Sequence, residues 1–351
     1  MPLASTRYPR FSVPITIQTV QATDSWQQQL RDVVTSRDEL LHMLGLDTED
    51  VGHANGACAD FALKAPRSFV QRMRYGDPRD PLLLQVLSSP QEMIDVPGYV
   101  RDPVGESGAT IPHRGIIHKY HGRVLLIVSG GCAVNCRYCF RRHFPYNENQ
   151  NSRQQWREAL QLIAADDSIE EVILSGGDPL VATDELLRQL IAQIAAIKHV
   201  RRLRIHTRLP VVIPDRVTTA LLDAIAHPGL QTVVVIHCNH AREIDDAVTG
   251  ALGALRDRGI TLLNQSVLLA GINDNLEAQL DLCQRLFASG TLPYYLHLLD
   301  KVQGAAHFDV PEHQAHSLLA GLTERLPGYM VPKLVREVAG AGSKIGQFPR
   351  E

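Results

Sequence analysis

The sequence predicts an α/β protein in which six βα units form a parallel array behind a helical and irregular N-terminal region. From residue 123 onward, short apolar runs rich in β-branched residues alternate with segments of ten or more residues that carry apolar side chains at helical spacing. Buried strands separated by helices of that length form parallel sheets with crossover connections. At 351 residues and 44% apolar content, the chain is long enough to bury a large core.

The N-terminal third, residues 1–110, is predicted to be an accessory region, and residues 111–351 hold the array and a C-terminal segment. After an irregular arm of about twenty residues, helical spacing recurs over residues 25–34 and 36–44, with Ser25 as an N-cap and Gly45 closing the second helix. A third helix is expected over residues 66–75. Five prolines between residues 78 and 103 then exclude long helices up to about residue 115.

The elements of the array follow from their apolar patterns. Continuous apolar runs predict strands at residues 124–128, 171–174, 203–206, 232–237, 261–268 and 294–298, and a further strand at the sheet edge over residues 333–338. Helical spacing predicts the intervening helices at residues 152–165, 184–197, 215–226, 243–258 and 275–288. Ligands of such sheets bind at the carboxyl ends of the strands, so residues that directly follow a strand are the candidates for chemistry.

Charge and composition favour a small-molecule partner. The formal net charge is −3, which gives no basic field for holding nucleic acid. Residues 1–20 contain three prolines and no continuous apolar segment, so neither a signal peptide nor a membrane span is expected, and we predict a cytoplasmic protein. A reducing compartment suits thiol-bound metal clusters better than disulfides.

Three cysteines follow the first strand of the array in the spacing CxxxCxxC, namely Cys132, Cys136 and Cys139. Thiolates are the ligands of iron-sulfur clusters, so three on one loop can hold three irons of a 4Fe-4S cubane. The fourth iron then stays open to chelate S-adenosylmethionine, whose reductive cleavage yields a 5′-deoxyadenosyl radical. Alternatives are three buried thiols or part of a zinc site, although zinc sites usually show a second CxxC pair. The isolated cysteines are interpreted as small buried apolar residues: Cys58, Cys238 and Cys283.

Polar or glycine residues also follow, end or lie within three of the other strands. The second strand is followed by Ser175, Gly176, Gly177 and Asp178, and glycine allows the backbone to approach a cofactor closely. Alone, this segment is an ordinary βα turn. Beside the cysteine motif, it resembles the Gly-Gly-Glu type of motif that binds the methionyl amino group in radical SAM enzymes. His237 ends the fourth strand and Gln265 lies in the fifth, where a lone polar residue is more often a satisfied core group than a ligand contact.

Lys344 is one of six lysines and follows a glycine-containing turn at residues 339–343. By itself it is most simply a solvated lysine near the C-terminus. Its position after the last predicted strand also allows a Schiff base with pyridoxal 5′-phosphate, whose ring acts as an electron sink.

Together these residues resemble the lysine 2,3-aminomutase family of radical SAM enzymes. The resemblance runs from about Trp26 to Lys344, with the cysteine motif, Gly-Gly-Asp and terminal lysine in the same order. Residues 61–70, 76–78, 81–87 and 131–146 are similar to the short branch that makes (R)-β-lysine for modifying translation elongation factor P. The resemblance implies a partial (βα)6 radical SAM barrel that converts free L-lysine to (R)-β-lysine. It also implies three cofactors: a 4Fe-4S cluster, S-adenosyl-L-methionine and pyridoxal 5′-phosphate.

The resemblance assigns roles position by position. The three cysteines of the motif match the cluster ligands, and Lys344 matches the catalytic pyridoxal lysine. Other cofactor contacts are expected from Lys119, Tyr120 and Arg123 near the phosphate, from residues 175–178, and from His237 and Gln265 beside adenosylmethionine. For the substrate, Arg141 matches the arginine that binds the α-carboxylate, a task that suits a bidentate guanidinium, while Asp300 and Glu337 match the acids that hold the side-chain ammonium.

Three departures from the fermentative members of the family are informative. Glu337 stands where those enzymes have aspartate, which lengthens the arm by one methylene. Lys119 replaces an arginine, which exchanges a planar fork for a point charge. The chain also ends soon after Lys344, without the zinc-binding C-terminal extension, and this feature is typical of the short branch.

The implied partners are free lysine, an electron donor protein and a functional link to elongation factor P and its ligase, and a homo-oligomer is compatible with the sequence. Two alternatives differ in substrate or class. One is a 2,3-aminomutase acting on another amino acid such as glutamate or arginine, of which glutamate is disfavoured by the acid pair. The other is a non-catalytic binding partner in the same pathway.

Overall fold

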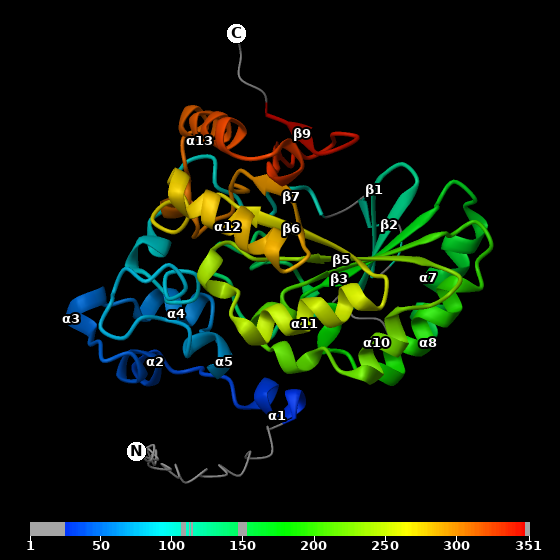
Figure 1. Ribbon diagram of the computed structural model, residues 1–351, viewed down its shortest axis with the longest axis horizontal. Coiled ribbons are helices and arrows are strands. Elements are labelled where there is room, and N and C mark those ends of the chain that lie inside the picture. The colour runs from blue at the N-terminus through cyan, green and yellow to red at the C-terminus, as the bar shows by residue number, and fades with distance from the viewer. Residues whose placement is uncertain (1–24, 107–109, 112, 114, 147–152, 348–351) are drawn as a thin grey trace, which may run out of the picture.

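The computed structural model describes residues 25–106, 110–111, 113, 115–146 and 153–347 (Figure 1). The predicted N-terminal arm and the first residue of the helix expected at 152–165 lie outside these residues. The accessory region holds short helices: α1 Trp26–Arg31, α2 Arg37–Met43, α3 Thr48–Val51, α4 Asn55–Asp60, α5 Arg67–Val70 and the 3-10 helix η1 Pro90–Met93. The proline-rich part of the chain thus contains only short elements, as expected. The third predicted helix is shorter than expected. After Val70 the amides of Arg72 and Met73 bond carbonyl oxygens three residues back, which forms a turn in place of a further α-helical turn.

A nine-stranded sheet forms the centre of the protein, and its strands follow one another in chain order. Strands β2 to β8 are parallel, whereas β1 and β9 pair antiparallel with their neighbours at the two edges. The strands are β1 Ile116–Tyr120, β2 Arg123–Ser129, β3 Glu171–Gly176, β4 Arg202–Thr207, β5 Gln231–Ile236, β6 Thr261–Val267, β7 Leu292–His297, β8 Lys333–Arg336 and β9 Ile345–Gly346. The six predicted strands and the predicted edge strand are therefore confirmed, while β1 and β9 were not predicted.

Crossover helices connect the parallel strands and cover one face of the sheet (Figure 1). They are α7 Arg153–Ala165, α8 Asp184–Ala195, α10 Thr219–Ile225, α11 Asp246–Asp257, α12 Leu276–Ala288 and α13 Glu312–Arg325. The helix expected at 215–226 is divided into the 3-10 turn η4 Pro214–Arg216 and α10, whose N-cap is Thr218 with its hydroxyl accepting from the Leu221 amide. The first five helices were predicted, and α13 was missed because few of its residues are apolar.

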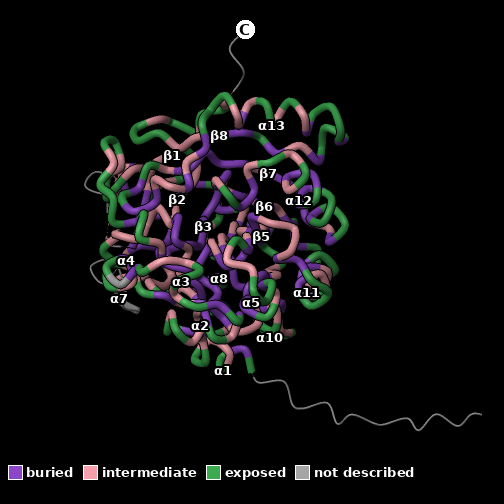
Figure 2. Tube along the Cα trace, turned by 90° about the vertical axis from the view of Figure 1, so that its left-hand side faces the viewer, coloured by how far each residue is buried: buried purple, intermediate pink, exposed green. Residues whose placement is uncertain are grey.

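Strand residues alternate between the helical layer and the opposite face. In β4, Leu203 and Ile205 are buried in the main hydrophobic cluster, whereas Arg204 and His206 line a cavity on the other side of the sheet. This two-residue period is a property of extended backbone. It gives the sheet one apolar face for packing and one polar face for chemistry, and Figure 2 shows the buried segments at the centre of the molecule.

The main hydrophobic core contains residues from both sides of residue 110, the predicted end of the accessory region. Phe69, Leu82 and Val86 of the accessory region belong to the same buried cluster as Leu203 and Ile205 of the sheet. The accessory region is thus packed onto the sheet. Its backbone bonds the loop after β2, and the side chains of Ser68 and Arg72 bond carbonyl oxygens after β4.

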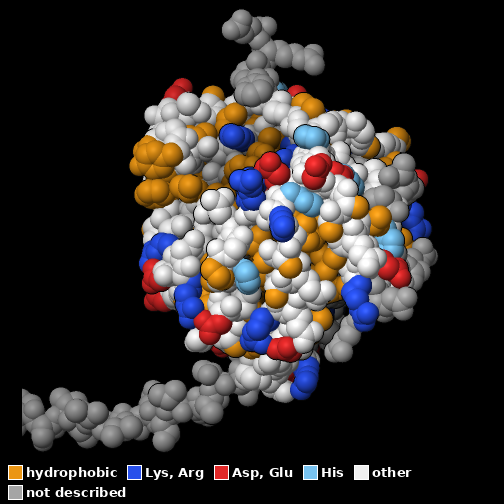
Figure 3. Space-filling model, turned by 90° about the vertical axis from the view of Figure 1, so that its right-hand side faces the viewer, with side chains coloured by type: hydrophobic (Ala, Val, Ile, Leu, Met, Phe, Trp, Pro, Cys, Tyr) orange, Lys and Arg blue, Asp and Glu red, His pale blue; other side chains and the backbone are white. Residues whose placement is uncertain are grey.

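No helix in the described part of the chain combines the length and apolar character needed to cross a membrane. On the face drawn in Figure 3, basic and acidic side chains are interspersed, without a block of one sign among the described residues.

Candidate active site

A cavity of about 310 Å³ lies on the polar face of the sheet. It is lined from strands β1 to β4, β6 and β7, from the loops after β2 to β5 and after β7, and from residues near the C-terminus. Because neighbouring parallel strands end at the same edge, residues far apart in the chain meet there. All the site residues predicted from the sequence line this cavity: Lys119, Tyr120, Arg123, Cys132, Cys136, Cys139, Arg141, Ser175, Gly176, Gly177, Asp178, His237, Gln265, Asp300, Glu337 and Lys344.

The accessory region shapes the cysteine loop. The Asn135 amide donates to the carbonyl of Lys64 at 2.9 Å, and the Arg137 amide donates to the carbonyl of Gln85 at 2.9 Å. The Lys64 ammonium reaches the carbonyl of Cys132 at 2.6 Å. These contacts hold the three thiols against one cavity although the loop itself has no regular secondary structure.

The cysteine loop offers three thiols, and thiolates are the ligands of iron-sulfur clusters. Within the described ranges, no group of three or more His, Cys, Asp or Glu side chains converges on one metal position. A cubane takes one thiolate per iron, so its ligands are spread around the cluster and need not converge. Burial raises the pKa of Cys139 to about 12 and that of Cys132 well above its usual value, and a bound metal would offset this cost by stabilising the thiolates. The isolated Cys238 and Cys283 are buried, as expected, and Cys58 is half-buried beside the Ser88 hydroxyl.

The glycine pair allows two loops to pack backbone to backbone. A Cβ on Gly177 would lie 2.4 Å from the carbonyl oxygen of Gly131, next to Cys132. Gly176 has φ +118, and a Cβ there would lie 2.4 Å from the carbonyl oxygen of Ser129. A side chain at either position would push the loop after β3 away from the cysteine loop, so both glycines are explained by close approach.

The Asp178 carboxylate is fully engaged within the protein. It accepts hydrogen bonds from the hydroxyl of Thr207 at 2.7 Å and from the amides of Leu180 at 3.0 Å, Arg208 at 2.8 Å and Leu209 at 3.1 Å. These bonds tie the loop after β3 to the end of β4. The Asp178 carboxylate therefore positions two loops. A direct contact between residues 175–178 and a ligand would have to come from the backbone or from Ser175.

Three histidine side chains line the cavity: His206, His237 and His297. His237 lies beside Gln265, with 2.9 Å between His237 Nε2 and Gln265 Nε2. Burial, together with the nearby Arg208 and Arg141 charges, lowers the pKa of His237 to about 3, so this ring is neutral. The Nε2 atoms of His206 and His297 are buried and have no hydrogen-bond partner among the residues that the structure describes. Buried polar atoms usually have partners, so these nitrogens indicate a ligand position.

Lysine ammonium groups alternate with carboxylates in the cavity lining. Glu337 lies between two lysines, 2.6 Å from the Lys119 ammonium and 2.7 Å from the Lys344 ammonium. Burial raises the pKa of Glu337, but the two lysine charges outweigh it and hold that pKa far below its usual value. Lys344 is thus an ion-paired residue of the cavity, and the simple interpretation as a solvated terminal lysine is wrong.

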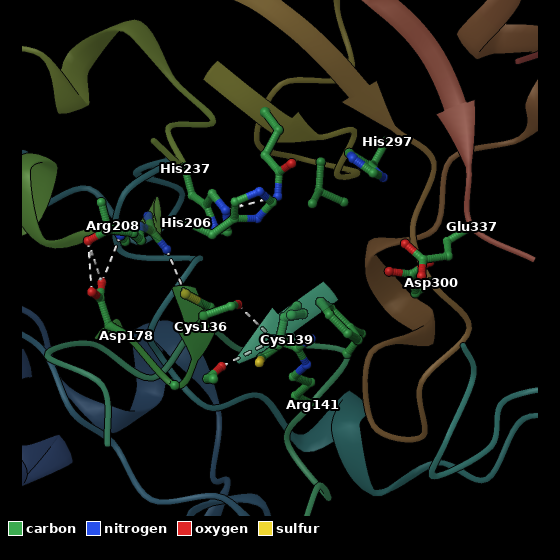
Figure 4. A pocket seen from close by; sticks show the side chains of 18 of the residues that line it. Cys136, Cys139, Arg141, Asp178, His206, Arg208, His237, His297, Asp300 and Glu337 are labelled. Carbon is green, nitrogen blue, oxygen red and sulfur yellow. Dashed lines mark hydrogen bonds between the residues drawn. The ribbon is translucent and has the colours of Figure 1, made fainter. Parts of the chain in front are cut away.

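Asp300 lies next to Glu337, on the side of the pocket away from Cys136 (Figure 4). Its Oδ1 atom is buried and has no hydrogen-bond partner in the described part of the chain. Burial and the neighbouring Glu337 charge raise the pKa of Asp300 to about 7. This carboxylate therefore lacks a cation of its own within the described structure.

Arg141 is held by a carboxylate that sequence reasoning missed. Its Nε and Nη2 atoms donate to both oxygens of Glu106 at 2.6 and 2.8 Å, and Nη1 donates to Ser175 Oγ at 3.1 Å. Glu106 also lies 3.7 Å from the Lys119 ammonium. Glu106 stands in the proline-rich segment with no motif around it, so no local signal identified it.

Two further predicted residues form a stack at the start of the sheet. The Arg123 guanidinium lies 4.7 Å from the ring centroid of Tyr120, and burial raises the pKa of that phenol, with Glu337 adding to the shift. Side chains two residues apart in a strand share a face of the sheet. This alternation would also have identified His206, on the face of Arg204 in β4, and His297, on the face of Tyr295 in β7.

The cysteine loop and the glycine pair, at the carboxyl ends of parallel strands, define a site of the radical SAM class. The sequence matches the Radical SAM superfamily over residues 126–283. It is 51% identical to an L-lysine 2,3-aminomutase of Escherichia coli, over 94% of this chain and 96% of that protein. The corresponding enzyme of Haemophilus influenzae is 46% identical, over 93% and 96%, and that of Clostridium subterminale is 31% identical, over 93% and 78%. The chain belongs to the L-lysine 2,3-aminomutase family of radical SAM enzymes.

Proposed function

We propose that this chain converts L-lysine to (R)-β-lysine by moving the α-amino group to Cβ. The observation that carries the proposal is one cavity that holds a three-thiol loop at one end and an ion-paired lysine beside two acids at the other. Relatives named L-lysine 2,3-aminomutase at 51% and 46% identity over nearly the whole chain support it.

The proposed cofactor sites use residues already described. The three cysteines would hold a 4Fe-4S cluster, His237 and Gln265 would contact S-adenosylmethionine, and Lys344 would bind pyridoxal 5′-phosphate with Lys119 near its phosphate. When bound, these groups supply a carbon-centred radical and an electron sink. The protein's part is to exclude water from the reacting atoms, and the cavity between the sheet and the accessory region suits that task.

The proposed substrate contacts follow from charge. Lys119 and Lys344 compensate Glu337, while Asp300 is ion-paired with no cation among the described residues. If Lys119 held the cofactor phosphate and Lys344 its aldehyde carbon, Glu337 would be free to join Asp300 around a new cation. The ε-ammonium of lysine is a cation of that kind, and burying it without paired acids would be costly.

The α-carboxylate is proposed to bind Arg141. Glu106 occupies the Nε and Nη2 side of this guanidinium, and Nη1 donates to Ser175 Oγ and to the Gly176 carbonyl. The carboxylate would therefore use the second Nη2 hydrogen and displace a contact of Nη1. Glu106 would then fix the direction in which those hydrogens point. A free amino acid is required, because lysine joined to protein through its carboxylate has no anion to offer.

The role of the product is proposed from the resemblance to the short branch. We infer that (R)-β-lysine supplies the modification of elongation factor P by its ligase, and that a separate electron donor protein reduces the cluster. A 2,3-aminomutase of another amino acid remains the second candidate, since Glu337 in place of aspartate changes the length of one acidic arm. A non-catalytic binding partner is the third.

The test is anaerobic incubation of the reconstituted protein with lysine, S-adenosylmethionine and a low-potential reductant, followed by chiral amino-acid analysis. (R)-β-lysine is expected. Glutamate and arginine serve as parallel substrates, and β-arginine without β-lysine would support the second candidate. A full cluster and bound pyridoxal without turnover of any of the three would favour the non-catalytic partner.

A further inference from the structure

A buried polar network surrounds the middle cysteine of the motif. Arg208 directly follows β4 and is 5% exposed. Its Nη1 atom lies 2.8 Å from the sulfur of Cys136 and 2.7 Å from the hydroxyl of Tyr138. Its Nη2 atom donates to Gln85 at 2.6 Å and to Glu243 at 3.0 Å. Figure 4 shows the guanidinium extending from the β4 loop toward Cys136.

Glu243 balances this charge from the far side. It is fully buried, and its Oε1 atom accepts from the amides of Asn239 at 2.9 Å and His240 at 3.0 Å and from the Gln85 side chain at 2.9 Å. The network therefore joins the accessory region, the cysteine loop and the ends of β4 and β5. A buried ion pair is weak evidence for a stabilising role, because apolar side chains of similar volume often serve stability as well or better.

The placement of the guanidinium suggests an electrostatic role instead. One-electron reduction adds negative charge to an iron-sulfur cluster and its thiolates. A hydrogen-bond donor and positive charge at a ligating sulfur stabilise the reduced form more than the oxidised form, which raises the reduction potential. A nearby carboxylate has the opposite effect.

We propose that Arg208 raises the reduction potential of the cluster through its contact with the Cys136 sulfur, and that Glu243 limits this effect. Arg208 is thus a positioning residue that acts on the cluster through its ligand. The inference rests on the proposed role of Cys136 as a cluster ligand. The electron comes from the same low-potential one-electron donor that the proposed reaction requires.

The experiment is a redox titration of the anaerobically reconstituted protein, without S-adenosylmethionine, monitored by the electron paramagnetic resonance signal of the reduced cluster. In Arg208→Gln, the ratio of reduced to oxidised cluster at a fixed potential should fall about tenfold, a shift of about 59 mV to more negative potential for one electron. Arg208→Lys keeps the charge and should shift less.

Glu243→Gln tests the sign of the electrostatic effect. Because it removes a negative charge, it should shift the reduction potential to a more positive value, opposite to Arg208→Gln. The double variant Arg208→Gln/Glu243→Gln removes both charges and keeps the buried network neutral if a single variant folds poorly. It should titrate below the wild-type protein, since the donor to the sulfur is lost. Arg216→Gln is the matched control, since Arg216 is also fully buried and ion-paired, 2.7 Å from Asp184, but lies outside the cavity lining. It should not move the potential.

Several outcomes would overturn the proposal. They are an unchanged potential in Arg208→Gln, a shift of the same sign in Glu243→Gln, or an equal shift in Arg216→Gln. Loss of iron from every Arg208 and Glu243 variant, with full iron in Arg216→Gln, would assign the network to cluster assembly instead. Iron content separates this failure from that of the ligand assignment, because full iron in Cys136→Ala would remove Cys136 as a ligand whatever the titration shows.

Discussion

Replacing Gly177 with alanine should separate the two loops that form the cofactor end of the cavity. The new Cβ would lie 2.4 Å from the carbonyl oxygen of Gly131 and 2.7 Å from its carbonyl carbon, whereas ordinary contact begins at 3.4 Å. Both obstructing atoms are backbone, so a change of side-chain rotamer cannot relieve the clash. The cysteine loop, or the loop after β3, must therefore move by about 1 Å.

The structure sets the size of the effect. Overpacking of this kind costs about 1–3 kcal/mol of the free energy of unfolding. The shift also strains the hydrogen bond of 2.9 Å from the Asp178 amide to the Gly131 carbonyl, which joins the same two loops. A displacement of 1 Å at reacting groups can lower turnover by about 100-fold. We expect both losses together, with the loss of turnover much the larger.

The assays are chemical denaturation of the cofactor-free protein, iron per chain after reconstitution, and the rate of β-lysine formation. Gly250→Ala in α11 is the matched control, because Gly250 has no neighbour within 4 Å of a Cβ. It should stabilise the protein by about 0.5–1 kcal/mol through helix propensity and leave turnover unchanged. Wild-type iron content and turnover in Gly177→Ala would refute the close-approach reasoning.

The remaining predictions concern metal, cofactor and substrate. Cys136→Ala should lose cluster iron on reconstitution, and Cys283→Ala should keep it. Lys344→Ala should lose the borohydride-trapped pyridoxal adduct, as mass spectrometry of peptides would show, while retaining iron; an adduct on another lysine would contradict the assignment. Asp300 binds a proton up to about pH 7 in the folded state but only to about pH 4 when unfolded, so the stability of the cofactor-free protein should fall as pH rises between these values, by on the order of 4 kcal/mol. Asp300→Asn should flatten this dependence in denaturant titrations and weaken lysine use by about 2 kcal/mol in kcat/KM. Glu337→Asp should lower the KM for free lysine with the product unchanged if the extra methylene impairs the fit, and an increased KM would show that the longer arm is required.

Local sequence determined much of the fold and the kind of chemistry. Apolar runs and helical periodicity predicted the strands β2 to β8 and five crossover helices, because burial of each element depends on its own pattern. The spacing of the cysteines and the glycine pair after β3 indicated a cluster site, since short loops carry their ligands together in sequence. The same logic missed α13, few of whose residues are apolar, and the two edge strands. In β1 the continuous apolar run is only Ile116 and Ile117, and β9 is two residues long.

Tertiary structure alone decided how the charges of the site are paired. Nothing near Glu106 indicates that it holds Arg141, and nothing near Arg208 indicates its contact with Cys136. Only the folded chain shows Lys344 ion-paired with Glu337 in the cavity, where the sequence alone favoured a solvated lysine. Electrostatic pairing depends on distances of a few ångströms between segments that may be more than a hundred residues apart, and such distances exist only after the strands have aligned their carboxyl ends.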